Sequence, residues 1–303
     1  MITRDVDAFV AFASNSAADF GPACAKAVFL VAPEGFALAE QSASDNRYMD
    51  LGLATDAAKA LAEHRGLQAA LSAVVPTICF PGRADTPDAQ FPNNVFATAP
   101  GRLLLGHMRH PVRQREAERP DIRGFFAQAM GYREIDLRAQ PGICELTGAL
   151  VIDRARGLGF CGLSERCDEA GAKAMHAAFG LRATLMFDLA PGEYHTNVVL
   201  SVLAGRAVVI APDGFADPAV VEGVARCYAP GVVRLGADEK LGFAGNCIAV
   251  AEQAVFMSAA AASALRPENR RILREAGFDI HAVPLAEIEK AGGSLRCCVA
   301  EIY

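Results

Sequence analysis

The chain ends with a cysteine that could act as a nucleophile. Cys297 follows Gly292-Gly293 and stands directly after Arg296. Glycines let the backbone take positive φ and let a ligand come close, and a neighbouring arginine lowers a thiol pKa. The alternative is an inert cysteine pair in a buried final strand. In such a strand Cys298 would point to the opposite face and fill the core.

Two further ionisable residues fit the same chemistry. Glu145 leads into an apolar stretch, where a lone carboxylate is rarely buried without a partner, and His195 begins another. A thiolate that attacks and an imidazole that moves protons form an activated nucleophile. A carboxylate can hold a guanidinium by paired hydrogen bonds, and an arginine can grip a substrate carboxylate. The set predicts an amino-acid-like substrate with a guanidino or ureido group, although a structural histidine is the ordinary alternative.

Composition excludes several classes of protein. The 303 residues are 52% hydrophobic with a net charge of −6, and no basic run alternates with aromatic residues, so nucleic acid is an unexpected partner. The N-terminus does not resemble a secretory signal, and no apolar run of about 18 residues predicts a membrane span. Nine scattered cysteines indicate reduced thiols and a cytoplasmic location. Without CxxC or HExxH spacing, we expect neither a metal nor a cofactor.

A unit of strand, tight turn, strand and helix recurs roughly every 50 residues, which is typical of stacked or circularly arranged supersecondary units. We therefore predict an α/β fold, a pseudo-symmetric propeller, in which residues 26–303 form one catalytic domain after a helical extension at 1–25. The alternative is an unrelated α+β fold with evenly spaced hairpins. The predicted hairpins span 95–105, 149–160, 197–210 and 247–257; the predicted helices span 168–179 and 218–228, and strand 27–31 with helix 57–71 would be a further copy.

Six short motifs occur along the chain in an order that resembles the guanidino-group-modifying superfamily. This superfamily contains arginine deiminases, arginine dihydrolases, dimethylarginine dimethylaminohydrolases and glycine amidinotransferases. The resemblance implies a five-bladed ββαβ propeller with a central site and suggests a homodimer. It implies that Cys297 is the nucleophile, His195 the general acid/base and Glu145 the substrate-orienting carboxylate, while Arg113 and Arg166 bind the substrate carboxylate. The motifs are FPNNVFA from 91, PVRQRE from 111, ELTGALV from 145, GLSERC from 162, YHTN from 194 and GGSLRC from 292.

The chain departs from the deiminase pattern at residues that would contact the reacting group. Asn94 and Asn197 stand where deiminases carry Asp, and Ala32 replaces an Arg that many members have before Pro33. An ionised Asp only accepts hydrogen bonds, whereas an amide also donates and can bind a ureido oxygen. The pattern is therefore closer to arginine dihydrolases and citrulline hydrolases, in which Asn46 resembles a further site residue.

These observations predict a cofactor-free, cysteine-dependent hydrolase that acts on the guanidino or ureido group of an arginine-like small molecule. Three alternatives stay open: an amidinotransferase, a dimethylarginine dimethylaminohydrolase, and a non-catalytic binding protein on the same fold.

Overall fold

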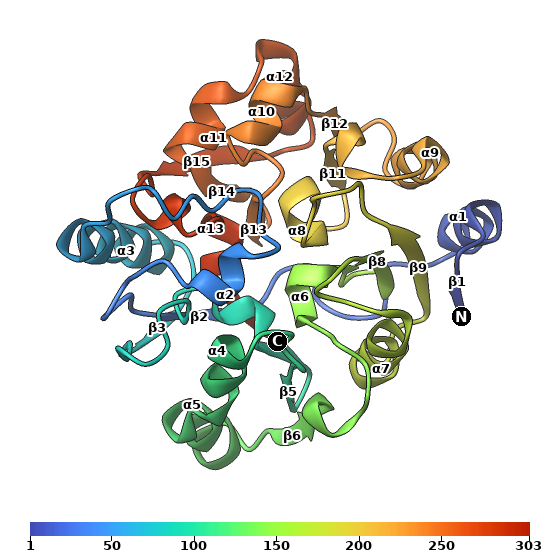
Figure 1. Cartoon of the computed structure of the whole chain (residues 1–303). Coiled ribbons are helices and arrows are strands. Elements are labelled where there is room, and N and C mark those ends of the chain that lie inside the picture. The colour runs from blue at the N-terminus through green and yellow to red at the C-terminus, as the bar shows by residue number, and fades with distance from the viewer.

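The computed structural model describes residues 1–303 as a mixed α/β fold with five separate small sheets (Figure 1). Each sheet contains one antiparallel hairpin whose second strand is joined by a parallel strand. In order along each sheet, the strands are β16 (Ala300–Ile302), β2 (Ala27–Val31) and β3 (Thr77–Phe80); β4 (Phe96–Ala99), β5 (Arg102–Leu105) and β6 (Arg133–Asp136); β7 (Leu150–Asp153), β8 (Leu158–Leu163) and β9 (Ala183–Asp188); β10 (Leu200–Leu203), β11 (Ala207–Ile210) and β12 (Val232–Arg234); and β13 (Ile248–Ala251), β14 (Ala254–Ser258) and β15 (Asp279–Val283).

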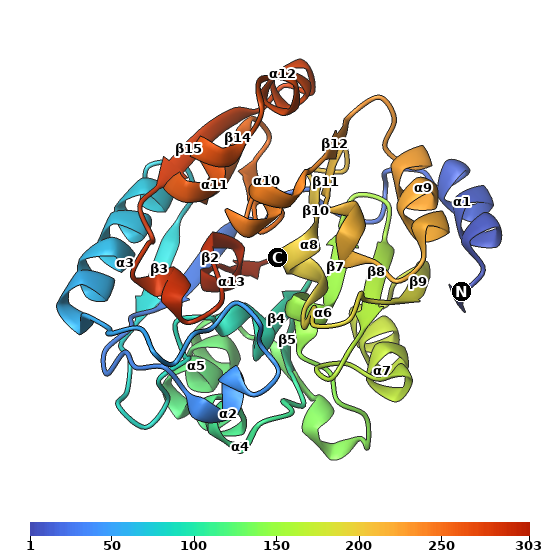
Figure 2. The same ribbon diagram turned by 45° about the horizontal axis from the view of Figure 1, so that its top comes forward.

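The longer helices lie at the periphery, and the short helical turns α6 (Leu146–Ala149), α8 (Thr196–Val199) and α13 (Leu295–Cys298) lie near the middle (Figures 1 and 2). None of the helices is long and apolar enough to cross a membrane. The longer helices are α1 (Val6–Ser14), α3 (Ala57–Ser72), α5 (Pro120–Gly124), which continues into η3 (Phe125–Ala129), α7 (Glu169–Phe179), α9 (Pro218–Arg226), α11 (Ala259–Ala264) and α12 (Pro267–Glu275). The shorter ones are α2 (Glu40–Ala43), η1 (Pro92–Asn94), α4 (Pro111–Gln114), η2 (Arg115–Glu118), η4 (Leu137–Ala139), α6 (Leu146–Ala149), α8 (Thr196–Val199), η5 (Pro212–Gly214), α10 (Ala237–Leu241), η6 (Ile288–Lys290) and α13 (Leu295–Cys298).

The two ends of the chain meet in one sheet. Strand β16 pairs antiparallel with β2, so that Ala300 lies opposite Phe29 and Ile302 opposite Ala27. In the other four sheets the antiparallel pair consists of consecutive strands. In this sheet the pair consists of strands from the C-terminal and N-terminal parts of the chain. Residues 2–3 form β1, which pairs parallel with β9, and α1 packs against α9.

The predicted hairpins are present, with two differences at their starts. Residues 197–199 and 297–298 were expected in strands but lie in the helical turns α8 and α13. A strand follows each turn, beginning at Leu200 and at Ala300. Because a short buried apolar run has no period that separates a helical turn from a strand, the pattern merged the two.

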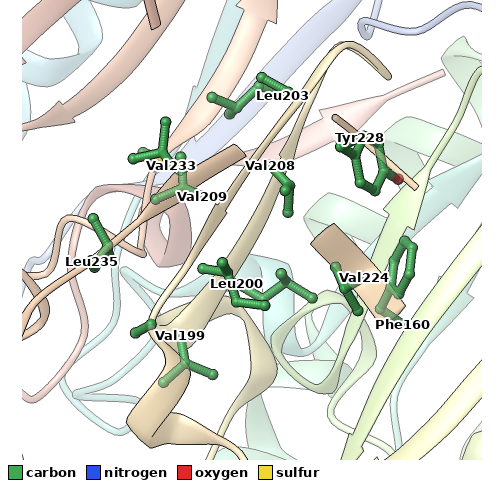
Figure 3. Close-up of a cluster of buried hydrophobic side chains, with 14 of the residues drawn as sticks. Phe160, Val199, Leu200, Leu203, Val208, Val209, Val224, Tyr228, Val233 and Leu235 are labelled. Atoms are coloured by element: carbon green, nitrogen blue, oxygen red, sulfur yellow. The ribbon is translucent and has the colours of Figure 1, made fainter. Parts of the chain in front are cut away.

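The core is divided among several apolar clusters. The largest has 37 buried residues and surrounds the sheet of β10, β11 and β12, part of which is drawn in Figure 3. A second cluster contains Cys297 and Cys298 together with residues of β2, β13 and α3. Cys298 therefore does pack in the core, but from a helical turn and not from the far face of a strand.

Candidate active site

Four helical turns at equivalent places in the fold present the predicted residues. Each turn precedes the first strand of a hairpin: η1 before β4, α6 before β7, α8 before β10 and α13 before β16. Asn94 ends η1, Glu145 and His195 are the residues just before α6 and α8, and Cys297 lies within α13. All four side chains are buried, so the fold gathers them away from bulk water.

A small cavity of about 280 Å³ lies beside Cys297. Five predicted residues line it, namely Cys297, Asn94, Asn46, Arg113 and Arg166. The other three do not. Glu145 and His195 form the layer behind the cavity, and Asn197 lines a different hollow together with Cys247 and Arg296.

His195 and Glu145 form a directly bonded pair. The Nε2 atom of His195 lies 2.8 Å from Oε2 of Glu145. An ionised carboxylate can only accept, so Nε2 carries the proton and Nδ1 is left as an acceptor, without a partner in the structure. Burial lowers the pKa of His195, and the hydrogen bond and charge of Glu145 only partly oppose this. The net lowering of the pKa favours the neutral ring. His195 is thus poised to take up a proton at Nδ1.

Glu145 is held in its ionised form by positive neighbours. Burial alone would raise its pKa, but Arg166, the hydrogen bond from His195 and more distant Arg113 outweigh burial and bring the pKa below its ordinary value. Arg166 donates from Nη1 to Oε2 at 3.2 Å, and the backbone N–H of Arg109 donates to Oε1 at 3.2 Å. Both carboxylate oxygens therefore have partners.

The thiol of Cys297 is surrounded by amides and not by cations. Asn246 donates from Nδ2 to Sγ at 3.3 Å, and Oδ1 of Asn197 lies 3.8 Å from Sγ. Burial raises the thiol pKa, against a smaller lowering by the Ser294 backbone, Asn246, Arg296 and Arg113. Arg296 does lower the thiol pKa, as expected from its place beside Cys297, but burial outweighs this effect. The guanidinium of Arg296 donates to Glu301 at 2.9 Å and to the carbonyl of Val299.

The two arginines are already engaged on most of their donors. Arg113 binds Glu116 through Nε at 2.7 Å and Nη2 at 2.9 Å, and Nη2 also donates to the carbonyl of Phe91. Its Nη1 makes no hydrogen bond. Arg166 uses Nε and Nη2 on Asp45 and donates once from Nη1 to Glu145. A substrate carboxylate can therefore receive the two N–H groups of Nη1 of Arg113 and one from Nη1 of Arg166.

The predicted asparagines have different surroundings. Oδ1 of Asn94 and Nδ2 of Asn197 are buried without a partner. Asn46 donates to the carbonyl of Gly292 at 3.3 Å and accepts from the N–H of Tyr48, so it holds the cavity wall. Gly148 of α6 lets the side chains of Asn94 and His195 lie close to its backbone. A Cβ at this position would lie 2.6 Å from Oδ1 of Asn94 and 2.9 Å from Nδ1 of His195.

Four residues near the site were not among those predicted from the sequence. Asp88 lines the cavity and accepts from Ser42 on one oxygen, while its other oxygen has no partner. Glu116 holds Arg113 and could have been found from its i,i+3 spacing. Asn246 donates to the thiol, and Asp45 binds Arg166. No group of three or more His, Cys, Asp or Glu side chains is placed to hold a metal ion.

A buried thiol, an imidazole paired with a carboxylate and two arginines near one cavity define the class: a hydrolase that acts on guanidino C–N bonds. The chain belongs to the family described as N,N dimethylarginine dimethylhydrolase, eukaryotic, which matches residues 32–303.

Known relatives agree with this membership. The chain is 26% identical over 217 residues to the N(G),N(G)-dimethylarginine dimethylaminohydrolase of Mycobacterium tuberculosis (strain ATCC 25618 / H37Rv), covering 72% of this chain and 67% of that protein. It is 23% identical over 239 residues to the uncharacterized protein YkgA of Bacillus subtilis (strain 168), covering 77% of this chain and 76% of that one.

Solved structures share the fold. The N-terminal domain of ArgZ, an arginine dihydrolase from the ornithine-ammonia cycle in cyanobacteria, solved bound to substrate, matches with a TM-score of 0.78 at 18% identity, covering 91% of this chain and 97% of that one. The dimethylarginine dimethylaminohydrolase of Pseudomonas aeruginosa, solved in complex with citrulline, matches with a TM-score of 0.71 at 20% identity, covering 92% of this chain and all of that one.

Proposed function

We propose that the protein hydrolyses the guanidino or ureido group of an arginine-like α-amino acid, with Cys297 as nucleophile. The observation that carries this proposal is the polarity of the cavity. The thiol and the Asn94 amide line it, and so do Arg113 and Asp88, each with a free donor or acceptor. That set fits a planar nitrogen-bearing group beside the thiol, a carboxylate on Arg113 and an ammonium on Asp88.

The first step is addition of sulfur to the central carbon. Burial keeps the resting thiol protonated, and a cationic guanidinium that binds against it favours the thiolate. His195 takes up the thiol proton at Nδ1 and delivers it to the leaving nitrogen, whose bond to the central carbon breaks so that it departs as ammonia. Glu145 keeps the imidazole oriented and stabilises its charged form through the 2.8 Å hydrogen bond.

The second step returns the enzyme to its starting state. Water, deprotonated by His195, attacks the carbon bound to sulfur, and the C–S bond breaks. Arginine and one water thus give citrulline and ammonia. If citrulline reacts in the same way with a further water, the products are ornithine, carbon dioxide and ammonia.

A product analysis tests the proposal. Purified protein is incubated separately with arginine, citrulline, agmatine and dimethylarginine, and the products are identified by mass spectrometry. We expect turnover of arginine or citrulline and none of agmatine, which offers no carboxylate to Arg113. Turnover of agmatine alone would contradict the amino-acid part of the proposal.

Dimethylarginine hydrolysis is the second candidate, because the family match spans residues 32–303. Release of dimethylamine in the same incubations would select it. The Asn94 amide suits a ureido oxygen, so dimethylarginine is the second candidate substrate. An amidinotransferase would instead form guanidinoacetate when glycine is added to arginine.

We also propose that the five sheets are the blades of a five-bladed ββαβ propeller with the site at its axis, in a domain of residues 26–303 extended by residues 1–25. The shared sheet pattern and the pairing of β16 with β2 support this reading. Free thiols at all nine cysteines support a cytoplasmic location. A homodimer is proposed from the resemblance alone.

A further inference from the structure

The segment of residues 42–49 separates the cavity from a larger outer hollow. Ser42, Asn46 and Met49 line the inner cavity, and Asn46 and Met49 also line the outer hollow of about 850 Å³. Met49 forms an isolated β-bridge to Ala291, close to the Gly292 carbonyl that Asn46 binds. This segment therefore forms part of the wall between the outer hollow and the cavity beside Cys297.

Asp45 fastens the segment to three basic side chains. Its carboxylate accepts from Nε of Arg166 at 2.9 and 3.0 Å, and it lies 3.0 Å from Nε2 of His110 and 3.3 Å from Nε of Arg109. The Asp45 side chain is 11% exposed and that of Arg166 is 2% exposed. Ion pairs this well buried are little screened by solvent, unlike those on an open surface.

This contact decides which edge of Arg166 the substrate meets. A guanidinium binds a carboxylate best along its Nε and Nη2 edge, where two parallel N–H groups match the two oxygens. Asp45 occupies that edge, and the carbonyl of Ser42 takes another N–H of Nη2 at 3.0 Å. Arg166 lines the cavity, whereas Asp45 lines the outer hollow, so the carboxylate holds the guanidinium from the outside.

We propose that Asp45 is a positioning residue that couples closure of the 42–49 segment to the orientation of Arg166. When Asp45 is seated, the segment covers the cavity, and Nη1 of Arg166 faces Glu145 and the substrate carboxylate. When it leaves, the cavity opens, and Arg166 loses the contacts that fix it. The inference rests on the proposed function only for the turnover measured below.

The test is Asp45→Asn, which should weaken substrate binding but speed the labelling of Cys297. The amide removes the charge and places an N–H donor against the donors of Arg166. We expect KM for the turned-over amino acid to rise about tenfold, because Arg166 is no longer held for its carboxylate. We expect Cys297 to react severalfold faster with chloroacetamidine, a small cation without a carboxylate, because the segment opens more often.

Asp50→Asn is the matched control. Asp50 is exposed just beyond the same segment and accepts only from the N–H of Gly52, so both measurements should stay at their wild-type values. If thermal unfolding shows that Asp45→Asn does not fold, the same two measurements are made on Asp45→Glu, which keeps the charge but misplaces it by one methylene.

An unchanged KM in the folded variant, or labelling that is not faster than wild type, would overturn the proposal. Labelling that slows together with a fall in stability would mean that Asp45 serves only the fold. Failure of the wild-type protein both to react with the probe and to turn over any substrate would instead count against the proposed function, so the two failures can be told apart.

Discussion

At the scale of single residues, the surroundings of Cys297 determine when it can react. Its nearest polar partners are the neutral amides of Asn246 and Asn197, and burial raises its pKa above the ordinary thiol value. A group with a raised pKa is deprotonated only at higher pH, so thiolate is scarce in the resting enzyme at neutral pH.

The labelling of Cys297 should therefore depend on pH. We expect the rate with iodoacetamide, an uncharged reagent, to rise about tenfold per pH unit through neutral and mildly alkaline pH, because the thiolate is the reactive form. Asn246→Ala removes the 3.3 Å donor to sulfur and should move the midpoint to still higher pH. A rate that is flat between pH 6 and 8 would indicate a resting thiolate and would contradict this description.

Asn94 should set the preference between ureido and guanidino groups. Asn94→Asp adds a negative charge beside the thiol, which favours a cationic guanidinium and disfavours a neutral urea. We expect kcat/KM for arginine divided by that for citrulline to rise at least tenfold, by analogy with the strength of charge-assisted hydrogen bonds. Asn94→Ala, which removes both functions, serves as the control and should lower both values. An unchanged ratio in the Asp variant would show that Asn94 does not contact the reacting group.

The sequence showed which residues could form the site, but not which of their side chains contact one another. Cys297, Asn94, Asn46, Arg113 and Arg166 all line one cavity. Asp88 and Asp45 were missed because they are ordinary acidic residues in irregular segments until the fold brings them to the two arginines. Arg296 lowers the thiol pKa as predicted, but the sequence could not show that burial outweighs it, since burial depends on the whole fold.

At the scale of elements, one helix cap supports the segment that carries Glu145. Asp168 caps α7 by accepting from the N–H of Gly171 at 2.7 Å, and its other oxygen accepts from the N–H of Ile143 at 3.1 Å. A Cβ at Gly171 would lie 1.9 Å from the Ile143 carbonyl, so the helix and the segment are in close contact. The cap therefore fixes the approach to Glu145 as well as the helix.

Asp168→Ala should cost more than loss of an ordinary cap. Replacing a capping Asp by Ala costs about 1 kcal/mol, and the lost bond to Ile143 adds roughly another 1 kcal/mol. Asp217→Ala is the control, because Asp217 caps α9 by one bond to Ala219 in an exposed position. The free energies of unfolding are compared in urea. If the two variants lose equal stability, the Ile143 bond contributes nothing.

At the scale of the whole molecule, the two ends of the chain are joined by β16 and β2. Ile302 is fully buried opposite Ala27, and Thr98 ties β4 to β16 by donating to the carbonyl of Glu301 and accepting from the N–H of Tyr303. Cys297 lies three residues before β16, so the pairing that joins the two ends of the chain also positions the nucleophile.

Shortening the side chain of Ile302 should weaken the packing around the pairing of β16 with β2. Ile302→Ala should lower the free energy of unfolding by about 2 to 5 kcal/mol, as expected for a large-to-small change in a packed core. Ile2→Ala is the control, because Ile2 is half-buried in the two-residue edge strand β1. Equal losses in chemical denaturation would show that the β16–β2 pairing is not a major source of stability.

The repeat was visible in the sequence because each hairpin turn and its flanking apolar strands are local. The partner of β2 was not, since β16 lies at the other end of the chain and no local pattern encodes pairing over that separation. Likewise, residues 197–199 and 297–298 were expected in strands, because the short apolar runs Val198-Val199 and Cys297-Cys298 fit a strand or a helical turn.

The most direct test of the central claim is to trap the covalent intermediate. Arginine or citrulline labelled with ¹³C at the guanidino or ureido carbon is mixed with enzyme, and the reaction is quenched in acid during turnover. The mass of the C-terminal peptide is then measured by mass spectrometry. The account predicts that the label is attached to Cys297, and that Cys297→Ser gives neither adduct nor product. Wild-type turnover by Cys297→Ser, or label attached to a different residue, would contradict it.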